Sequence, residues 1–319
     1  MLFEASQLPD TIGLRATALM NIVTDSAADL TADDIAAYGL TVAPLTIQLP
    51  EGERRSEELS PDDFYDRLEA MQPAVPTTNQ PSPGLLAELY RRAAGPAASP
   101  TISIHISSGL SGTANAARLA ATDFAPGEVT VVDTLTLSGG QRFQVLAAAV
   151  AARAGWPAAA IVELLGRIQA QTEVIFTLET LSYLSRGGRI GRVQALAGAV
   201  LNLKPLIDVS HGDGKYNTVG KSRTLPRALA DLAEHLAGLY PGGEPLWVSV
   251  MHGRLPAQAE RLAGLLRERL TIGRLEVLRV SPVLGVHTGP GVVGAAVMPL
   301  RLLEEAGRAY QGASSSILA

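Results

Sequence analysis

Short apolar segments alternate with helix signals along the first half of the chain. Segments rich in β-branched side chains are typical of buried strands, and here they cover residues 21–24, 40–49, 101–106 and 128–133. Helices are expected between successive strands, and another is expected over residues 138–153. Strands that are joined through helices run parallel, so the alternation predicts a parallel sheet with helices on both faces.

Individual residues mark where helices and loops of this half begin and end. Thr31 is followed by two acidic residues and predicts a helix start, and Gly39 predicts the end of the same helix. Residues 72–84 contain four prolines, each of which fixes one backbone angle. This segment is therefore expected to be a stiff loop between two helices.

The second half of the chain combines hairpins with crossovers. The pattern changes near residues 156–172, after which a strand is expected at 173–178 and a hairpin over 205–220 that turns at Asp213 and Gly214. Further helices and strands are expected at 225–239, 246–252, 256–270, 275–280 and 292–298. The mixture predicts a mixed sheet backed by helices.

These patterns together predict an α/β chain of two domains. A length of 319 residues is sufficient for two cores. We assign residues 1–19 to an N-terminal extension and residues 20–165 to a three-layer α/β/α domain with a parallel sheet. Residues 166–319 are expected to form a second α/β domain with a mixed sheet.

The composition argues against several classes of function. A net charge of −5 without a run of Lys or Arg disfavours binding to nucleic acid or to anionic membranes. The chain has no Cys, and its five His residues lack metal-binding spacing, so no metal site is expected. Glu4 and Asp10 lie where a signal peptide would be apolar, and no long uncharged apolar run suggests membrane insertion. We therefore expect a cytoplasmic protein.

One turn of the chain concentrates polar side chains. The segment "SSGLSGT" (107–113) follows an expected strand and precedes a helix. Such a turn could bind an anion through the backbone N–H groups of the helix start, activate a serine, or only reverse the chain. The residues of this segment alone leave the three interpretations open.

Six loops, taken in order, carry a combination of motifs that is far more specific than any one of them. They are "IVTDSAADL" (22–30), "PTTNQPSPG" (76–84), "SSGLSGT" (107–113), "LSRGGRIG" (184–191), "KSRT" (221–224) and "GVHTGPGVVG" (285–294). In this order and at these spacings they closely resemble the DegV family of bacterial fatty-acid-binding proteins. The resemblance covers about residues 20–300.

The resemblance implies a carrier protein without catalytic activity of its own. Its ligand would be a long-chain fatty acid such as palmitate, buried between the two domains, and no cofactor is implied. Family members present the bound acid to a separate fatty acid kinase, which makes an acyl phosphate for phospholipid synthesis. By the same resemblance we expect a monomer. Such a ligand needs several hydrogen-bond donors at its carboxylate and a dry tunnel for its tail.

The resemblance also assigns two carboxylate-binding positions in the proline-rich loop. Thr78 matches the threonine whose hydroxyl contacts the carboxylate in the family. Asn79 departs from the family pattern, which usually has serine there, but an amide can still donate a hydrogen bond.

A second group of candidates follows the parallel strands. Ser111 matches the serine before "GT" in the turn and is expected at the carboxylate, where a helix begins. Ser108 is a secondary candidate in the same turn. Ser26 is another, because it follows the first strand at the carboxyl end of the sheet, the usual ligand edge of such folds.

Two further positions come from the second half of the chain. His287 matches the histidine that supports the carboxylate-binding threonine through a hydrogen bond. Arg223 matches an arginine on the surface that engages the kinase in family members. The other four histidines, His105 among them, are interpreted as structural.

Parts of the sequence also fit two other classes of function, which are less favoured than the carrier. A serine hydrolase could use Ser111 and His287, because "GLSGT" nearly fits the nucleophile elbow, although Thr113 replaces its final glycine. A phosphotransferase would need a histidine that binds substrate covalently, for which no convincing counterpart is present. The segment "SRGGRIGR" (185–192) lacks the Lys and Ser or Thr of a phosphate-binding loop. It is expected to be a structural turn.

Overall fold

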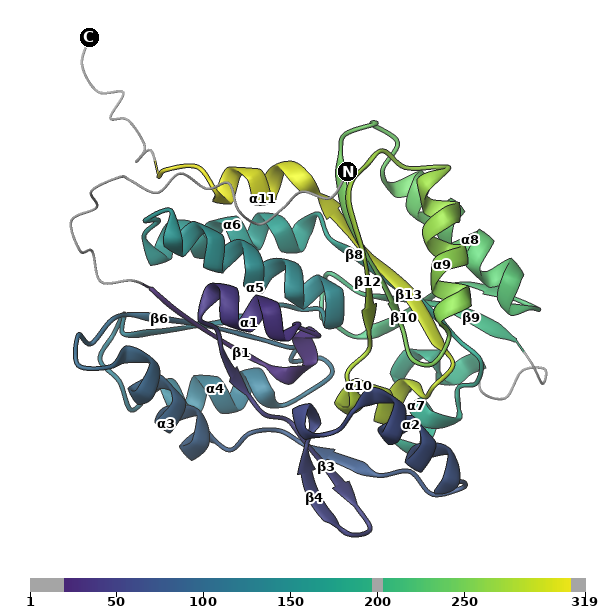
Figure 1. The fold of residues 1–319 in the computed structure, drawn as a ribbon, viewed down its shortest axis with the longest axis horizontal. Helices are drawn as coiled ribbons and strands as arrows, with labels where there is room; N and C mark the ends of the chain where they lie inside the picture. The colour runs from purple at the N-terminus through teal and green to yellow at the C-terminus, as the bar shows by residue number, and fades with distance from the viewer. Residues whose placement is uncertain (1–19, 197–202, 311–319) are drawn as a thin grey trace.

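A four-stranded parallel sheet forms the core of the first half of the protein. The structure, a computed structural model, describes residues 20–196 and 203–310 (Figure 1). The strand order is β2-β1-β6-β7, and every neighbouring pair is parallel. The strands are β1 (Asn21–Asp25), β2 (Thr41–Ala43), β6 (Thr101–His105) and β7 (Val129–Asp133). The predicted parallel sheet is therefore confirmed.

Helices cover both faces of this sheet. On one face α3 (Pro83–Ala94) and α4 (Thr113–Ala121) pack Tyr90 and Ala117 against Val23. On the other face α5 (Ser138–Arg153) packs Phe143 towards Ile102, and α1 (Ala32–Tyr38) lies beside it. The limits of α1 follow its caps, since the Thr31 side chain accepts from the backbone of Asp34 and Gly39 adopts a left-handed φ of 64°.

A small antiparallel sheet corrects two local predictions. The expected strand at 40–49 is divided at Pro44, which has no N–H for a strand ladder, and its two parts belong to different sheets. The expected loop at 72–84 contains a short strand that pairs with the second of these parts. The sheet has the order β4-β3-β5, from β3 (Thr46–Leu49), β4 (Gly52–Arg55) and β5 (Thr77–Asn79), and α2 (Pro61–Ala70) lies between β4 and β5 in the chain.

The second half is built on a six-stranded mixed sheet in the order β10-β9-β8-β13-β11-β12. Only β11 and β12 pair in parallel, and the other neighbours are antiparallel. The strands are β8 (Glu173–Leu178), β9 (Lys204–Val209), β10 (Tyr216–Ser222), β11 (Leu246–His252), β12 (Ile272–Arg279) and β13 (Val292–Pro299). The predicted mixed sheet and the β9–β10 hairpin are both confirmed, and Gly214 in its turn has a φ of 63°.

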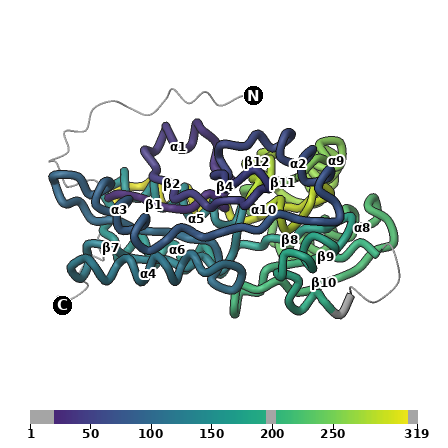
Figure 2. The backbone as a smooth tube through the Cα atoms, turned by 90° about the horizontal axis from the view of Figure 1, so that it is seen from below, coloured from purple at the N-terminus to yellow at the C-terminus, as the bar shows by residue number. Residues whose placement is uncertain are grey.

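The two halves meet along α5. The outer face of the six-stranded sheet is covered by α8 (Leu225–Leu239) and α9 (Pro256–Arg267), and its inner face packs on α5, α6 (Ala158–Ala170) and α11 (Leu300–Ala306). In α5 only Val150 and Arg153 are not buried, which its alanine-rich sequence permits. Figure 2 shows the halves side by side, with α3 and β7 at one end and α8 at the other.

A buried cluster of charged side chains connects the two halves. The Arg142 guanidinium, 3% exposed, donates Nε to Glu276 of β12 at 3.2 Å and Nη2 to Asp34 of α1 at 3.1 Å. Burial alone would raise the pKa of Asp34, but the hydrogen bonds from Arg142 hold it below its usual value. One buried arginine thus serves two carboxylates, and Arg274 adds a longer contact to Glu276 at 3.6 Å.

Short helices complete the junction beside the small sheet. They are α7 (Ser182–Arg186), α10 (Pro282–Thr288) and the 3-10 helices η1 (Ser26–Ala28), η2 (Ser56–Glu58) and η3 (Gly191–Leu196). In Figure 1, α7, α10 and α2 gather close to β3 and β4. The end of the "SRGGRIGR" segment enters η3, and residues 197–202 lie outside the described residues. The limit between the domains at residue 165 stays a prediction.

Candidate functional site

The two halves contribute one side chain each to a hydrogen bond at their junction. Thr78 Oγ1 on β5 lies 2.9 Å from His287 Nε2 on α10. Thr78 is half-buried, whereas its neighbours Thr77 and Asn79 are exposed. The hydrogen bond expected between Thr78 and His287 is therefore present.

The surroundings of His287 keep its imidazole neutral. Burial, with a smaller contribution from the nearby positive charge of Arg189, lowers the pKa of His287 to about 4. Nδ1 has no hydrogen-bond partner among the residues that the structure describes. One ring nitrogen therefore serves Thr78, and the other is buried.

At Gly187, in the "SRGGRIGR" segment, the backbone lies directly against the His287 ring. A Cβ atom at Gly187 would lie 2.3 Å from His287 Nδ1, so any other residue would displace the imidazole. The segment was expected only to be a turn. Its sequence gave no signal of this contact, because the histidine is about a hundred residues away in the chain.

Side chains of the first half fix the start of α10. Asp29 Oδ1 accepts from the Ser281 backbone N–H at 2.9 Å, and Ser56 Oγ accepts from the Val283 N–H at 3.1 Å. These bonds satisfy N–H groups that have no partner inside the helix. Burial disfavours the charged form of Asp29 and raises its pKa to about 6, so keeping this carboxylate ionised costs free energy.

The polar turn after β6 is held by residues at the ends of two strands and by the turn of a hairpin. Asp25, at the end of β1, accepts from the Ile106 N–H at 2.9 Å, and Asp133, at the end of β7, accepts from the Ser108 N–H at 3.0 Å. Ser107 Oγ donates to the Gly214 carbonyl of the β9–β10 hairpin at 2.8 Å. The turn is thereby fastened to both halves of the protein.

Ser111 lies directly before α4. Its Oγ is 2.8 Å from Thr113 Oγ1 and accepts from the Thr113 N–H at 3.3 Å, and the residue is half-buried. The next residue, Gly112, touches the loop of Thr78, since a Cβ there would lie 2.1 Å from Gln80 Oε1. The two loops that carry Thr78 and Ser111 are therefore neighbours.

The remaining candidates have other partners. Asn79 Nδ2 donates to Glu53 Oε1 at 2.9 Å on the exposed side of β5, and Ser26 Oγ accepts from the Leu45 N–H at 2.9 Å. Ser108 is half-buried and is held through its backbone. Arg223 is exposed at the end of β10. Carboxylate or partner contacts of these four residues stay predictions.

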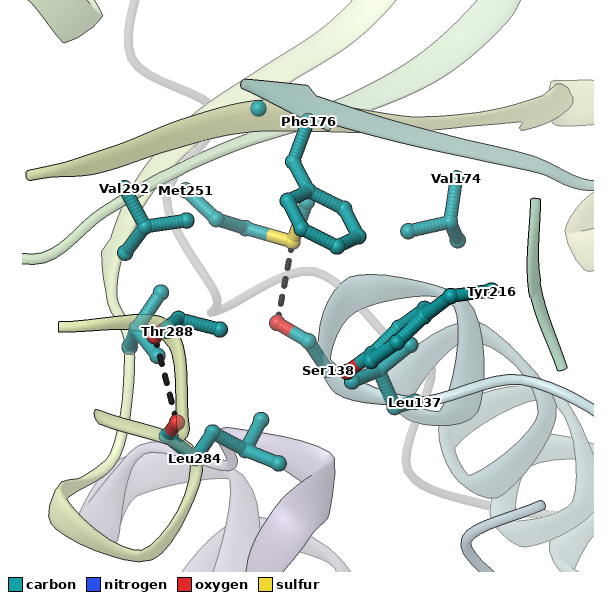
Figure 3. A pocket seen from close by; sticks show the side chains of 11 residues that line it. Leu137, Ser138, Val174, Phe176, Tyr216, Met251, Leu284, Thr288 and Val292 are labelled. Atoms are coloured by element: carbon teal, nitrogen blue, oxygen red, sulfur yellow. Dashed lines mark hydrogen bonds between the residues drawn. The ribbon is translucent and has the colours of Figure 1, made fainter. Parts of the chain in front are cut away.

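A narrow apolar cavity lies between the halves, beside α10 (Figure 3). Its volume is about 30 Å³, room for one or two water molecules, so its apolar walls lie close together in this structure. Thr288, which follows His287, lines it, as do Leu137, Ser138, Val174, Phe176, Tyr216, Met251, Val280, Leu284, Val292 and Gly294. Most of these residues had no individual signal in the sequence, because several strands and helices contribute only one or two of them each.

The geometry does not assemble the hydrolase that the sequence left open. Ser111 Oγ is hydrogen-bonded to Thr113, while His287 is bonded to Thr78. A Ser–His–Asp array does exist at Ser103, His105 and Asp25, but all three side chains are completely buried. A nucleophile there has no access to a substrate.

Two absences can be stated for the residues that the structure describes. Among residues 20–196 and 203–310, no group of three or more His, Asp or Glu side chains could hold a metal ion. In the same ranges, no helix is long and apolar enough to cross a membrane.

Comparisons with known proteins give one consistent result. A family model described as "Uncharacterised protein, DegV family" matches residues 20–300. A DegV domain-containing protein of Streptomyces coelicolor is 41% identical over 278 residues, which is 86% of this chain and 97% of the relative. Another from Deinococcus radiodurans is 40% identical over 258 residues, covering 81% of this chain and 88% of the relative.

Solved structures agree with these sequence matches. The structure described as fatty acid binding of a DegV family protein from Thermus thermophilus has a TM-score of 0.83 and 34% identity, covering 88% of this chain and 99% of that one. The structure of DegV, described as a fatty acid binding protein from Bacillus subtilis, has a TM-score of 0.78 and 27% identity, covering 88% and 98% of the two chains. The resemblance of the six loops is thus confirmed across most of the chain.

Proposed function

The chain belongs to the DegV family, and on that premise we propose that it binds a long-chain fatty acid such as palmitate. The fatty acid binding described for the Thermus thermophilus and Bacillus subtilis proteins supports this ligand class. In the proposed complex the carboxylate lies at Thr78 and Ser111, with His287 behind Thr78. The tail enters the apolar cavity between the halves, whose walls move apart to admit it.

The observation that carries the proposal is the position of the Thr78–His287 pair. The pair is polar and half-buried, and Thr288, the residue after His287, already forms part of the apolar wall. A ligand that spans this boundary needs a hydrogen-bonding head and an apolar body. A fatty acid has both.

The neutral histidine would prepare Thr78 to donate. If Nε2 carries the ring proton and donates to Thr78 Oγ1, the threonine hydroxyl keeps its own proton for a carboxylate oxygen. A charge-assisted bond of this kind is stronger than one between neutral groups. His287 thus acts on the ligand through Thr78.

The loop of Ser111 would supply the second side of the head site. Ser111 precedes α4, a helix of nine residues, whose first-turn N–H groups and positive dipole end favour a negative charge. The Gly112–Gln80 approach brings this helix start next to the loop of Thr78. Two loops from different strands would therefore share one carboxylate.

Burial of the tail would supply most of the affinity. Each methylene transferred from water to the cavity contributes about 0.8 kcal/mol, so a long chain gains on the order of 10 kcal/mol before ordering costs. The head contributes less and fixes the orientation. The ligand would then lie with its carboxylate towards the junction of α10 and β5.

The proposed role extends to delivery of the acid. A carrier in the cytoplasm would present the carboxylate to a fatty acid kinase, which forms the acyl phosphate used in phospholipid synthesis. The exposed Arg223 is the proposed contact for that kinase. The protein itself would act as a monomer and catalyse no step.

A calorimetric titration of delipidated protein with palmitate tests the binding proposal. We expect saturation at one acid per chain, and about tenfold weaker binding for Val292→Phe, which fills the cavity. Val277→Phe on β12 is the matched control, because Val277 is 36% exposed. Absence of palmitate binding to the wild-type protein would refute the proposal.

A further inference from the structure

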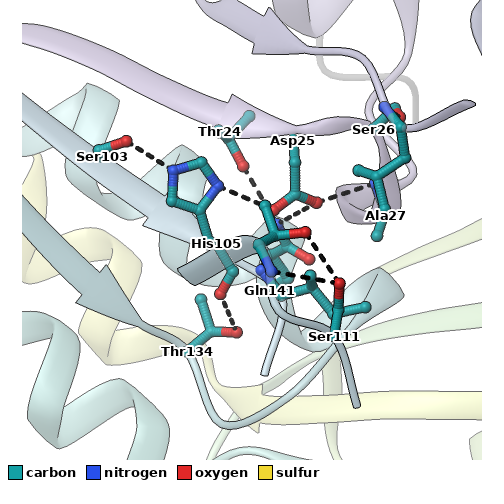
Figure 4. A network of polar contacts seen from close by, with 12 residues as sticks. Thr24, Asp25, Ser26, Ala27, Ser103, His105, Ser111, Thr134 and Gln141 are labelled. Carbon is teal, nitrogen blue, oxygen red and sulfur yellow. Dashed lines mark hydrogen bonds and ion pairs between the residues drawn. The ribbon is translucent and has the colours of Figure 1, made fainter. Parts of the chain in front are cut away.

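Four buried side chains form a continuous hydrogen-bond chain behind the head site. Tyr90 Oη of α3 lies 2.8 Å from Ser103 Oγ, which lies 2.6 Å from His105 Nε2. His105 Nδ1 lies 2.9 Å from Asp25 Oδ2 (Figure 4). All four side chains are completely buried. The chain therefore runs through the protein interior without access to solvent.

One arrangement of protons satisfies every bond of this chain. Asp25 can only accept, so the His105 ring proton lies on Nδ1, and Nε2 accepts from the Ser103 hydroxyl. The Ser103 oxygen then accepts from the Tyr90 hydroxyl. Each bond points towards Asp25, and such directed chains strengthen one another in a low dielectric.

Asp25 connects this hydrogen-bond chain to the backbone. Its Oδ2 also accepts from the Ile106 N–H at 2.9 Å, and its Oδ1 accepts from the Ala27 N–H at 3.0 Å and from Gln141 Nε2 at 3.1 Å. Ile106 is the residue that leads into the turn of Ser111. The carboxylate is thus the point at which the side-chain network meets that turn.

The two ends of the chain belong to the two head-site loops. Tyr90 is on α3, the helix that directly follows the loop of Thr78, and Asp25 holds the start of the loop of Ser111. The same loops touch at their tips, where Gln80 meets Gly112. The buried hydrogen-bond chain therefore connects the ends of the two loops, and the contact between Gln80 and Gly112 connects their tips.

Stability alone does not account for such a network. Burying ionisable and hydroxyl groups carries a desolvation cost, and well-packed apolar side chains of similar volume are often at least as stable. What a fully satisfied polar network adds is a single defined geometry. That geometry matters where two loops must converge on one small anion.

We propose that His105 and Tyr90 are positioning residues for the carboxylate site. They act through Asp25 and Ser103, and hold the loops of Thr78 and Ser111 at the separation that one carboxylate bridges. This inference rests on the proposed fatty acid function. It assigns no catalytic role to Ser103.

The test is head-group discrimination, measured as the ratio of the affinities for palmitate and hexadecanol. Both ligands fill the cavity, but only palmitate carries the charge. We expect His105→Leu and His105→Gln to lower the ratio about fivefold or more. His105→Asn should lower the ratio by only about twofold to threefold, because Asn retains a donor near Nδ1 for Asp25 but loses the acceptor for Ser103.

Tyr90→Phe is the second variant, since it removes one hydroxyl and preserves the core volume. It should lower the ratio by about twofold to threefold. Tyr240→Phe is its control. The Tyr240 hydroxyl lies within hydrogen-bond distance of the Gln171 and Val297 carbonyls, which belong to neither loop. Its loss should change stability but not the ratio.

Unchanged ratios in the His105 and Tyr90 variants would overturn the positioning role while leaving the proposed function intact. An equal loss of affinity for both ligands would also overturn it, because that result describes general destabilisation. If wild-type protein binds neither ligand, the proposed function itself fails. The two failures are therefore distinguishable.

Discussion

Thr78 Oγ1 and His287 Nε2 lie 2.9 Å apart, although 209 positions separate the two residues in the chain. Their contact joins β5 of the small antiparallel sheet to α10 of the second half. Asp29 and Ser56 of the first half hold the start of the same helix. The head site therefore exists only when both halves are folded and docked.

The Thr78 hydroxyl is expected to contribute directly to carboxylate binding. Thr78→Val keeps the shape of the side chain and should weaken palmitate binding by about 1–3 kcal/mol, the usual contribution of a bond to a charged group. Calorimetric titration measures the change. Thr77→Val is the matched control, because Thr77 is exposed on the other side of β5. Equal affinities for wild type and Thr78→Val would remove Thr78 from the site.

His287 should make stability depend on pH in acid. Burial lowers its pKa from 6.5 to about 4, so the unfolded chain binds this proton first as the pH falls. Wild type should lose roughly 2 kcal/mol of stability relative to His287→Gln between pH 6.5 and 4. Urea unfolding of both ligand-free proteins across this range tests it. If the free energies of unfolding of the two proteins changed equally with pH, this result would contradict a neutral, buried imidazole at His287.

Arg142 is expected to be a large contributor to the joining of the halves. Arg142→Met leaves Asp34 and Glu276 without their shared cation and should lower the free energy of unfolding by about 3 kcal/mol. Arg92→Met removes an exposed pair with Glu88 and should cost less than about 0.5 kcal/mol. Similar losses in the two variants would show that burial of the cluster has no energetic consequence.

Arg223 should affect delivery of the acid but not its binding. Arg223→Glu is expected to retain palmitate at wild-type affinity and to abolish acyl-phosphate formation by a cognate fatty acid kinase, since the charge of an exposed contact is reversed. Arg261→Glu, an exposed arginine on α9, is the control and should support the kinase normally. Normal phosphorylation with Arg223→Glu would exclude this surface from the kinase contact.

Much of the fold could be predicted because local rules decide it. Thr31 and Gly39 cap α1 as their residue types require, and Gly214 turns the hairpin between β9 and β10. The division at Pro44 was also readable, since proline cannot continue a strand ladder. The strand β5 was not, because its three residues depend on pairing with β3.

The site was less accessible to sequence reasoning. Similarity to a family pointed to Thr78 and His287, but no local pattern predicts that Gly187 must be small beneath His287 Nδ1. His105 was interpreted as structural, and its full burial agrees with that. Its connection to Asp25 and the turn of Ser111 is a tertiary contact between neighbouring strands, which a single sequence does not encode locally.

The central claim is that the cavity between the halves holds a fatty acid. The most direct measurement is mass spectrometry of the organic extract from denatured protein purified from a bacterial host, followed by palmitate uptake by the delipidated chain. The account predicts close to one C14–C18 fatty acid per chain, and its replacement by added palmitate. No stoichiometric fatty acid in the extract, together with no uptake of palmitate, would contradict it.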